Sequence, residues 1–385
     1  MKILIVGKVP THPVQMGNSR LITDQATLLK ELGHDVHYLY IHEVRRKEKT
    51  QDVTPAAFKE MVDFWGEKFH LLRINKLRHL FLITRAALKY RLTNGYIHPD
   101  DHYSSSIHRE INRLNRKYEF DCCIVNYYYL SKALKYISIP GKALLTHDIF
   151  TFRDMVCDYK VRESLTPNHE ALAVQRAQFI LNVQDEDSIY FKKLAPKSTI
   201  LTTYTSFKYT PTNYVGTHNI LYLSGNSIFN TNGIRWFIDQ ILPKLSHKIP
   251  DVCLMIGGGI SNALKEYHNH PNIKLCGYID DTDSFFNSGD VFINPTYQGT
   301  GLKIKTFEGI AHGKVVLSHP HSTIGIYNRA NAPLISSDNP EKWAAEIIEC
   351  FNDPNKILRI KDNCAQYLSD MNTFIEKQYS ILLNS

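Results

Sequence analysis

The chain has 385 residues, of which 43% are hydrophobic, and a formal net charge of +7. This length and apolar content predict a globular protein of two domains and exclude a mainly disordered chain. No apolar run reaches the roughly 20 residues of a membrane-spanning helix. The seven cysteines lack the spacing of zinc ligands, so we expect reduced thiols in a cytoplasmic protein.

The first half alternates short apolar runs with helical patterns, which is typical of a parallel sheet covered by helices. Strands are predicted at Lys2–Gly7, Asp35–Ile41, Cys122–Asn126, Lys142–Thr146, Phe179–Val183 and Ser198–Leu201. A helix is predicted over Leu21–Leu32, and residues 44–118 are expected to be helical and basic. A dinucleotide-binding domain is excluded because no GxGxxG follows the first strand.

Excess positive charge is concentrated between Arg45 and Lys117, where 16 lysines and arginines stand against 8 aspartates and glutamates. Within this segment, residues 73–92 show apolar side chains at helical spacing among six cations. Such a basic amphipathic helix is a candidate for peripheral contact with an anionic membrane on its inner face. The alternative is a helix packed on the sheet with a solvated basic face. No nucleic-acid motif accompanies the charge, so no nucleic-acid partner is expected.

Residues 202–218 show no periodicity and are predicted to link two halves. Further strands are predicted at Asn219–Leu223, Val252–Ile256, Ile273–Leu275, Val291–Ile293 and Val315–Leu317, with helices at Gly233–Leu242, Ile304–Ala311 and from Trp343 onward. The acidic run 280–283 is predicted to cap a helix rather than to bind a metal.

The stretch 289–319 reads GDVFINPTYQGTGLKIKTFEGIAHGKVVLSH. It resembles the nucleotide-sugar signature E-G-F-G-L-x-x-x-E-A-M-A-x-G-x-P-V-V of GT-B glycosyltransferases of retaining family 4, in a GTGxKxK-E variant. The positions in step are Gly301, Ile304, Glu308, Gly309, Ala311, Gly313, Val315 and Val316. The segment YLSGNSIFNTNGIRWFIDQILPKL also resembles the family pattern that follows the first strand of the second domain.

The resemblance implies the GT-B fold, two Rossmann-like α/β domains whose parallel sheets face a central cleft. It implies an acceptor-binding domain over 1–205, a nucleotide-sugar-binding domain over 206–360, and a C-terminal helix over 361–385 that crosses back to the first domain. The expected reaction moves a sugar from a UDP- or GDP-linked donor to a glycan or lipid-linked acceptor, with retention, in surface polysaccharide synthesis. No metal or other cofactor is expected. A non-catalytic nucleotide-sugar-binding scaffold and a sugar-nucleotide epimerase are the alternatives.

For the donor, the resemblance implies that Glu308 accepts hydrogen bonds from the ribose hydroxyls. The other donor-binding candidates are Gly225, Asn226, Thr300, Gly301, Leu302, Lys303 and Ile304. Three departures from the family pattern stand out: Thr300 replaces a carboxylate, Lys303 replaces a glycine, and asparagines at 226 and 232 replace the cations that hold the diphosphate. We therefore expect Lys303 to be catalytic by neutralising the leaving diphosphate. Lys305 is a weaker candidate because it should face elsewhere.

In the first domain, Gly17, Asn18 and Arg20 resemble the family's glycine-rich loop, whose backbone N–H groups face phosphate or acceptor. An ordinary connecting loop is the alternative. His147 follows a predicted strand at the position of the family's catalytic histidine, although a structural histidine would fit the same pattern. Asp148 is a candidate acid or orienting group. Arg153 is a candidate partner for phosphate or for charge on the acceptor.

Overall fold

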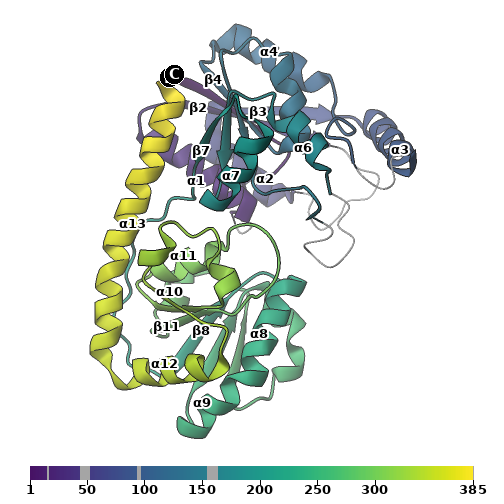
Figure 1. Ribbon diagram of the computed structural model, residues 1–385. Coiled ribbons are helices and arrows are strands. Elements are labelled where there is room, and N and C mark those ends of the chain that lie inside the picture. Colours follow the sequence, from purple (N-terminus) through teal and green to yellow (C-terminus); the bar gives the residue numbers. More distant parts are fainter. Residues whose placement is uncertain (15–16, 44–52, 93–96, 154–163, 385) are drawn as a thin grey trace. The chain divides into compact units, whose positions relative to one another are not determined.

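The structure, a computed structural model, describes residues 1–14, 17–43, 53–92, 97–153 and 164–384 (Figure 1). The chain forms two compact units. Unit 1 comprises Met1–Ser206 and Ile375–Ser385, and unit 2 comprises Phe207–Phe374. Each unit is built around one parallel sheet, so the α/β prediction is confirmed.

Unit 1 contains a seven-stranded parallel sheet in the order β3-β2-β1-β4-β5-β6-β7. The strands are β1 (Lys2–Gly7), β2 (Asp35–Glu43), β3 (Phe69–Ile74), β4 (Cys122–Asn126), β5 (Gly141–Leu145), β6 (Phe179–Asn182) and β7 (Thr199–Thr202). The helices are α1 (Gly17–Glu31), α2 (Pro55–Trp65), α3 (Lys76–Leu92), α4 (Ser106–Tyr118), η2 (Tyr128–Lys135), α6 (Pro167–Val174) and α7 (Asp185–Leu194). The core lies between the sheet and these helices, and residues 3–6 of β1 are fully buried.

Two expectations for unit 1 are wrong. Residues 69–74, expected to be helical, form the edge strand β3, which pairs with β2 through Tyr38 and Phe69 onward. This strand lies at the edge of the sheet and only its Ile74 is buried. Its sequence, FHLLRI, therefore does not show the continuous apolar run by which a central strand is predicted. The predicted loop at 17–20 is the first turn of α1. Of the segment expected to be helical, residues 44–52 and 93–96 lie outside the described residues.

Unit 2 contains a six-stranded parallel sheet in the order β10-β9-β8-β11-β12-β13. The strands are β8 (Asn219–Leu223), β9 (Cys253–Gly257), β10 (Ile273–Gly277), β11 (Val291–Asn294), β12 (Val315–Ser318) and β13 (Leu334–Ser336). The helices are α8 (Ile228–Gln240), α9 (Leu242–Lys248), α10 (Thr282–Phe286), α11 (Ile304–Ala311), α12 (Pro340–Asn352) and α13 (Pro354–Leu383). One face of the sheet packs on α8, α9 and α12 through a large apolar cluster.

In both sheets, strands distant in sequence become neighbours at one point, β1 beside β4 in unit 1 and β8 beside β11 in unit 2. The connections on either side of such a point leave in opposite directions and open a crevice at the carboxyl ends of the strands. Each unit therefore carries one predicted ligand-binding position, fixed by topology alone.

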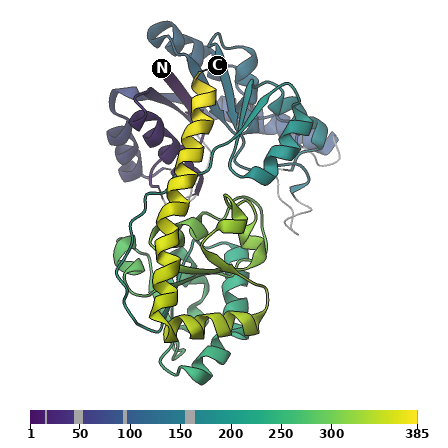
Figure 2. The same ribbon diagram turned by 60° about the vertical axis from the view of Figure 1, so that its left-hand side comes forward.

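Residues 203–218 contain no helix or strand, as expected for a linker, but much of the segment is bound to unit 2. The backbone N–H groups of Val215 and Gly216 donate to the Asp290 carboxylate, at 3.1 Å and 2.8 Å. The buried Lys314 ammonium donates to Thr212 Oγ1 and, at 2.6 Å, to the carbonyl of Gly289. Figure 2 shows α13, a single helix of 30 residues that contributes to both units.

Candidate functional site

The candidate site of unit 2 begins where the β8 and β9 turns pack backbone against backbone. Gly258 has a φ of 92°, and a Cβ there would lie 2.3 Å from the carbonyl oxygen of Ser224, so only glycine fits. The N–H of Ser224 donates to Gly257, at 3.1 Å. Gly225 and Asn226 follow in the connection to α8, and the Asn226 backbone nitrogen lies 3.7 Å from where a Cβ on Gly259 would stand. This part of the site is therefore lined by backbone.

Lys305 reaches this point from α11. Its Nζ donates to Asn230 Oδ1 at 2.6 Å and to Ser224 Oγ at 3.0 Å, and it lies 5.2 Å from the centre of the Tyr222 ring. Burial, with a smaller effect from the neighbouring Lys303 charge, lowers the pKa of Lys305 to about 7. The Lys305 amino group therefore lies at the carboxyl end of β8. Within the described part of the chain, its hydrogen-bond acceptors are all neutral oxygens.

The two lysines of the signature have different hydrogen-bond partners. Lys303 Nζ donates to the carbonyl oxygens of Thr300 and Gly301, each at 3.0 Å, and so binds its own loop. Lys305, expected to face elsewhere, instead contacts the β8–α8 region, in which asparagines replace the family's cations. Lys305, and not Lys303, is therefore the lysine that these hydrogen bonds place beside the segment between β8 and α8.

Glu308 lies one helical turn after Lys305, so the two side chains share a face of α11. The start of this helix is tied to β11 by a hydrogen bond of 2.8 Å from Asn294 Nδ2 to Thr306 Oγ1. Gly309 permits close packing, since a Cβ there would lie 2.8 Å from the Phe292 ring. Strand β11 therefore fixes the position of the helix that carries both charged groups.

The loop before α11 bends through two glycines in the left-handed region, Gly299 with a φ of 96° and Gly301 with a φ of 73°. The loop lies against the start of α8, because Asn232 Nδ2 donates to Gln298 Oε1 at 3.4 Å. The remaining predicted donor residues, Thr300, Leu302 and Ile304, belong to this loop and to the first residue of α11. The structure thus brings the donor-binding candidates of unit 2 into one cluster.

The candidate site of unit 1 centres on His147, two residues after β5, with a φ of 63°. Its Nε2 lies 2.8 Å from Asn126 Oδ1, at the end of β4. Asn126 Nδ2 donates to the carbonyl of Val6 at 3.2 Å, so the amide is oriented with its oxygen toward the histidine. Because an amide oxygen only accepts, His147 Nε2 carries the proton and Nδ1 carries a lone pair.

Aromatic stacking holds this imidazole. The Tyr127 ring lies parallel to His147, with ring centres 4.0 Å apart, and Tyr127 also has a positive φ, of 69°. Desolvation lowers the pKa of His147 to about 3, so the ring is neutral at physiological pH. Backbone strain at two stacked residues is typical of a functional position rather than of ordinary core packing. The site can accept a hydrogen bond from a hydroxyl group at Nδ1.

The predicted phosphate or acceptor loop contacts this cluster through Asn18. Asn18 Nδ2 donates to the hydroxyl of Tyr127 at 3.3 Å, which places the first turn of α1, with Gly17, beside the stacked rings. Arg20 pairs along the helix with Asp24, Nε to Oδ2 at 3.3 Å. The first turn of α1 therefore belongs to the His147 site, with Arg20 engaged by its own helix.

The segment after His147 is held by a buried carboxylate that the sequence did not single out. Glu170 accepts hydrogen bonds from the N–H groups of Phe150 and Thr151, each at 2.9 Å. Burial raises the pKa of Glu170, while those hydrogen bonds lower it. Asp148 and Arg153 form an ion pair at 3.4 Å, so these two predicted residues are brought together.

Asp187 was also missed, because acids in the first turn of a helix are ordinary partners of the helix dipole. The structure buries its side chain, where Oδ1 accepts from Gln184 Nε2 at 2.7 Å. Burial, together with the charges of Asp148 and Glu186, raises the pKa of Asp187 to about 7. Only tertiary packing could reveal this group.

The predicted cap at 281 is confirmed, since Asp281 Oδ1 accepts from the N–H of Ser284 at 3.0 Å.

Comparison with solved structures identifies the architecture. HepE (Alr3699) of Anabaena, solved in complex with UDP, aligns over 100% of both chains with a TM-score of 0.67 and 14% identity. The chain has the GT-B fold. TarM of S. aureus, solved with Fondaparinux, alpha-GlcNAc-glycerol and UDP, aligns over 100% of both chains with a TM-score of 0.67 and 9% identity. A glycosyltransferase from Rickettsia africae covers 99% of this chain and 97% of its own, with a TM-score of 0.64 and 15% identity.

Sequence comparison is more specific for the second half of this GT-B chain. Residues 217–353 match the family described as glycosyl transferases group 1. An uncharacterized 44.6 kDa protein in the cps region of Klebsiella pneumoniae is 21% identical, over 96% of each chain. The family match covers β8 to β13 of unit 2, and therefore the Lys305 cluster.

Proposed function

We propose that this protein is a glycosyltransferase that moves a sugar from a nucleoside-diphosphate donor, UDP- or GDP-linked, to a glycan or lipid-linked acceptor. The group 1 match over unit 2 and the GT-B fold support this reaction. The Klebsiella pneumoniae relative from the cps region supports a role in surface polysaccharide synthesis. The family resemblance of the signature supports transfer with retention. The observation that carries the proposal is the placement of Lys305 and Glu308 on one face of α11 at the end of β8.

Unit 2 is proposed to hold the donor. Glu308 would accept two hydrogen bonds from the ribose hydroxyls. Lys305 Nζ would neutralise charge on the departing diphosphate, together with the backbone N–H groups of the glycine-lined turns. Its present partners, the oxygens of Asn230, Ser224 and Tyr222, are neutral acceptors that a phosphate oxygen can join or replace. With this charge supplied by the chain, we propose that transfer needs no divalent metal ion.

Lys303 is proposed to stabilise the loop before α11 rather than to bind the diphosphate. Its Nζ holds the carbonyl oxygens of Thr300 and Gly301, and so fixes the shape of the loop that precedes α11. A donor sugar lying against Thr300 would meet a hydroxyl where the family has a carboxylate. The identity of the sugar is therefore expected to differ from that preferred by members with the carboxylate.

Unit 1 is proposed to hold the acceptor. Neutral His147 would accept a hydrogen bond at Nδ1 from a sugar hydroxyl and orient it. Asp148 and Arg153, paired with each other, are proposed to bind polar or anionic groups of the acceptor. Asn18 and the first turn of α1 would complete this surface beside Tyr127.

The test is a nucleotide screen followed by a turnover assay. Thermal unfolding of the purified protein is measured with UDP, GDP and other nucleoside diphosphates, and a panel of nucleotide sugars is then assayed for hydrolysis and transfer, with and without EDTA. We expect one base to raise the unfolding temperature and Glu308→Ala to abolish that increase. Binding without turnover of any donor would support a scaffold, and release of an isomerised sugar nucleotide would support an epimerase. Loss of turnover with EDTA would contradict metal independence.

A further inference from the structure

Helix α3 exposes an unusual amount of apolar surface. Five of its large apolar side chains define what we call the α3 face. Their exposed fractions are Leu77 80%, Leu80 51%, Phe81 65%, Leu88 61% and Leu92 75%. The helix is attached to unit 1 mainly through Leu82 and Ala86, which are buried. Exposed leucines are ordinary when isolated, but a group on one helix marks an interaction surface.

The α3 face is one continuous stripe. Leu77, Phe81, Leu88 and Leu92 are separated by four, seven and four residues, a spacing that returns to the same side of an α-helix. The buried residues Leu82 and Ala86 lie on the opposite side. The stripe is about four turns long, which is the geometry of a helix lying flat on an apolar boundary.

The charges of α3 are all positive. The helix carries five cations and no acid: Lys76, Arg78, Arg85, Lys89 and Arg91. Two nearby carboxylates are already engaged, Asp101 by Lys89 at 3.2 Å and Asp100 by Lys132 and Arg176. An apolar stripe flanked by cations complements an apolar layer beneath negatively charged groups. This charge pattern fits the surface of an anionic lipid membrane.

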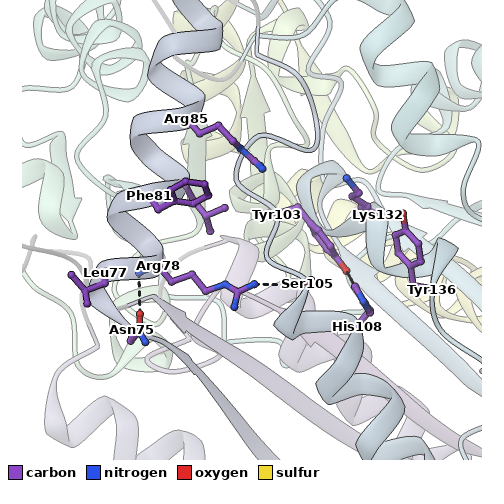
Figure 3. Close-up of a pocket in the computed structure, with 11 residues that line it drawn as sticks. Asn75, Leu77, Arg78, Phe81, Arg85, Tyr103, Ser105, His108, Lys132 and Tyr136 are labelled. Carbon is purple, nitrogen blue, oxygen red and sulfur yellow. Dashed lines mark hydrogen bonds between the residues drawn. The ribbon is translucent and has the colours of Figure 1, made fainter.

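A pocket of about 680 Å³ adjoins the α3 face (Figure 3). Its walls are aromatic and basic: Phe81, Tyr103 and Tyr136 with Arg78, Arg85 and Lys132. Figure 3 shows Arg78 and Arg85 extending from the helix toward Tyr103. The pocket and the stripe share Leu77 and Phe81, so one bound surface would cover both.

Two guanidinium groups converge at the rim of this pocket. Arg78 and Arg109 each donate an NH2 hydrogen bond to Ser105 Oγ, at 2.9 Å and 2.7 Å. Among the residues that the structure describes, neither arginine is paired with a carboxylate. Two adjacent guanidinium groups on a shared neutral hydroxyl form a ready binding position for a phosphate group.

We propose that unit 1 docks on an anionic phospholipid bilayer through the α3 face, with Arg78 and Arg109 binding lipid phosphates. No helix in the described part of the chain is long and apolar enough to cross a membrane, so this contact would be peripheral. The surface lies outside the Lys305 and His147 clusters, and the proposal does not depend on the proposed transferase activity.

The test is flotation of the full chain with vesicles. The purified protein is mixed with phosphatidylcholine vesicles, or with vesicles containing about 30% phosphatidylglycerol, and centrifuged at low and high salt. We expect co-flotation with the anionic vesicles at low salt, little with the neutral ones, and release as salt rises, because the Debye length shortens.

Two variants and two matched controls identify the surface. The variant Leu77→Gln/Phe81→Gln/Leu88→Gln keeps strong helix formers, and we expect vesicle binding to fall by about tenfold or more. The variant Arg78→Gln/Arg109→Gln should lose most of the preference for anionic lipid. The controls, Ile189→Gln and Lys193→Gln/Lys197→Gln, remove comparable exposed groups elsewhere on unit 1 and should bind as the wild type. Circular dichroism checks that each variant is folded.

Three results would overturn the proposal. The first is absence of flotation at low salt with the anionic vesicles. The second is binding by a folded Leu77→Gln/Phe81→Gln/Leu88→Gln variant that equals that of the wild type. The third is a dimer in light scattering that these three substitutions dissociate, which would show that a second copy of the chain covers the α3 face.

Discussion

The two units place their candidate sites at the same topological position but equip them differently. In unit 1, a neutral imidazole is fixed by stacking on Tyr127, by Asn126 and by a strained backbone. In unit 2, an ammonium group is held by neutral oxygens beside turns that only glycine can form. The first arrangement accepts a hydrogen bond from an uncharged group, and the second compensates negative charge. Similar parallel sheets therefore serve complementary electrostatic tasks through the few residues that follow each strand.

Removing the cation of unit 2 should have the largest effect. Lys305→Met is expected to lower turnover by about 10²–10³-fold, because a lost charge partner at a leaving group costs several kcal/mol. Lys303→Met is the matched comparison and should lower turnover by about tenfold or less, since that lysine binds its own loop. Turnover of both variants is measured at saturating donor. A larger loss in Lys303→Met would reverse the assignment of the two lysines.

The imidazole of unit 1 comes next. His147→Ala should lower turnover by about 10²-fold with donor affinity unchanged, because a hydrogen bond that orients the acceptor is lost. His147→Gln, whose side-chain oxygen also accepts a hydrogen bond, should recover part of the rate. Steady-state kinetics with varied donor and acceptor separate the two effects. Weakened donor binding in either variant would place His147 in a different role.

The tautomer of His147 gives a sharper test of the same contrast. Asn126→Asp puts a carboxylate at Nε2, which should raise the pKa of His147 from about 3 toward or above its ordinary value of 6.5. Below that pKa the ring would gain a proton at Nδ1 and lose its acceptor. We therefore expect turnover of the variant to fall as pH drops from about 8 to about 6, while the wild type shows no such step. Proton NMR of the histidine ring measures the pKa directly.

A pH titration of nucleotide binding tests the ammonium of unit 2. Free Lys305 has a pKa lowered to about 7 by burial, and a bound diphosphate should raise it. Because the ligand binds the protonated form, affinity should be constant below pH 7 and weaken by up to about tenfold per pH unit above it. Lys305→Met should show weak binding without this step, and calorimetry of UDP or GDP binding follows both proteins. A step that survives in Lys305→Met would assign the titration to another group.

The smallest effect concerns stability. The Asp187 carboxyl titrates near 3.8 when unfolded and near 7 when folded, so folding takes up a proton between these values and stability falls as pH rises through them. Asp187→Asn should remove this loss of stability with pH. The free energy of unfolding of the variant minus that of the wild type should therefore be about 1–3 kcal/mol larger at about pH 8 than at about pH 4. Urea unfolding at both pH values measures the difference. An equal difference between the two proteins at both pH values would contradict the raised pKa.

Local sequence patterns predicted most of the fold but less of the site. Strands such as β1 and β4 contain a continuous apolar run and were predicted. The edge strand β3 was not predicted, because His70 and Arg73 interrupt its apolar residues. The direction of Lys305 depends on its contact with Ser224 at the end of β8, more than 80 positions away in the sequence. The tautomer of His147 likewise depends on Asn126 and, through it, on Val6. Such pairings are set by tertiary packing, which no local pattern contains.

The segment 207–216 has a practical consequence for dissecting the molecule. The match to glycosyl transferases group 1 starts at residue 217, yet Asp290 accepts hydrogen bonds from Val215 and Gly216, and Lys314 donates one to Thr212. A fragment cut at the family boundary would remove two backbone donors of the buried Asp290 carboxylate and one partner of the buried Lys314 ammonium, at a cost of several kcal/mol. A fragment that begins at Phe207 keeps them. Limited proteolysis should accordingly spare this segment, although it contains no helix or strand.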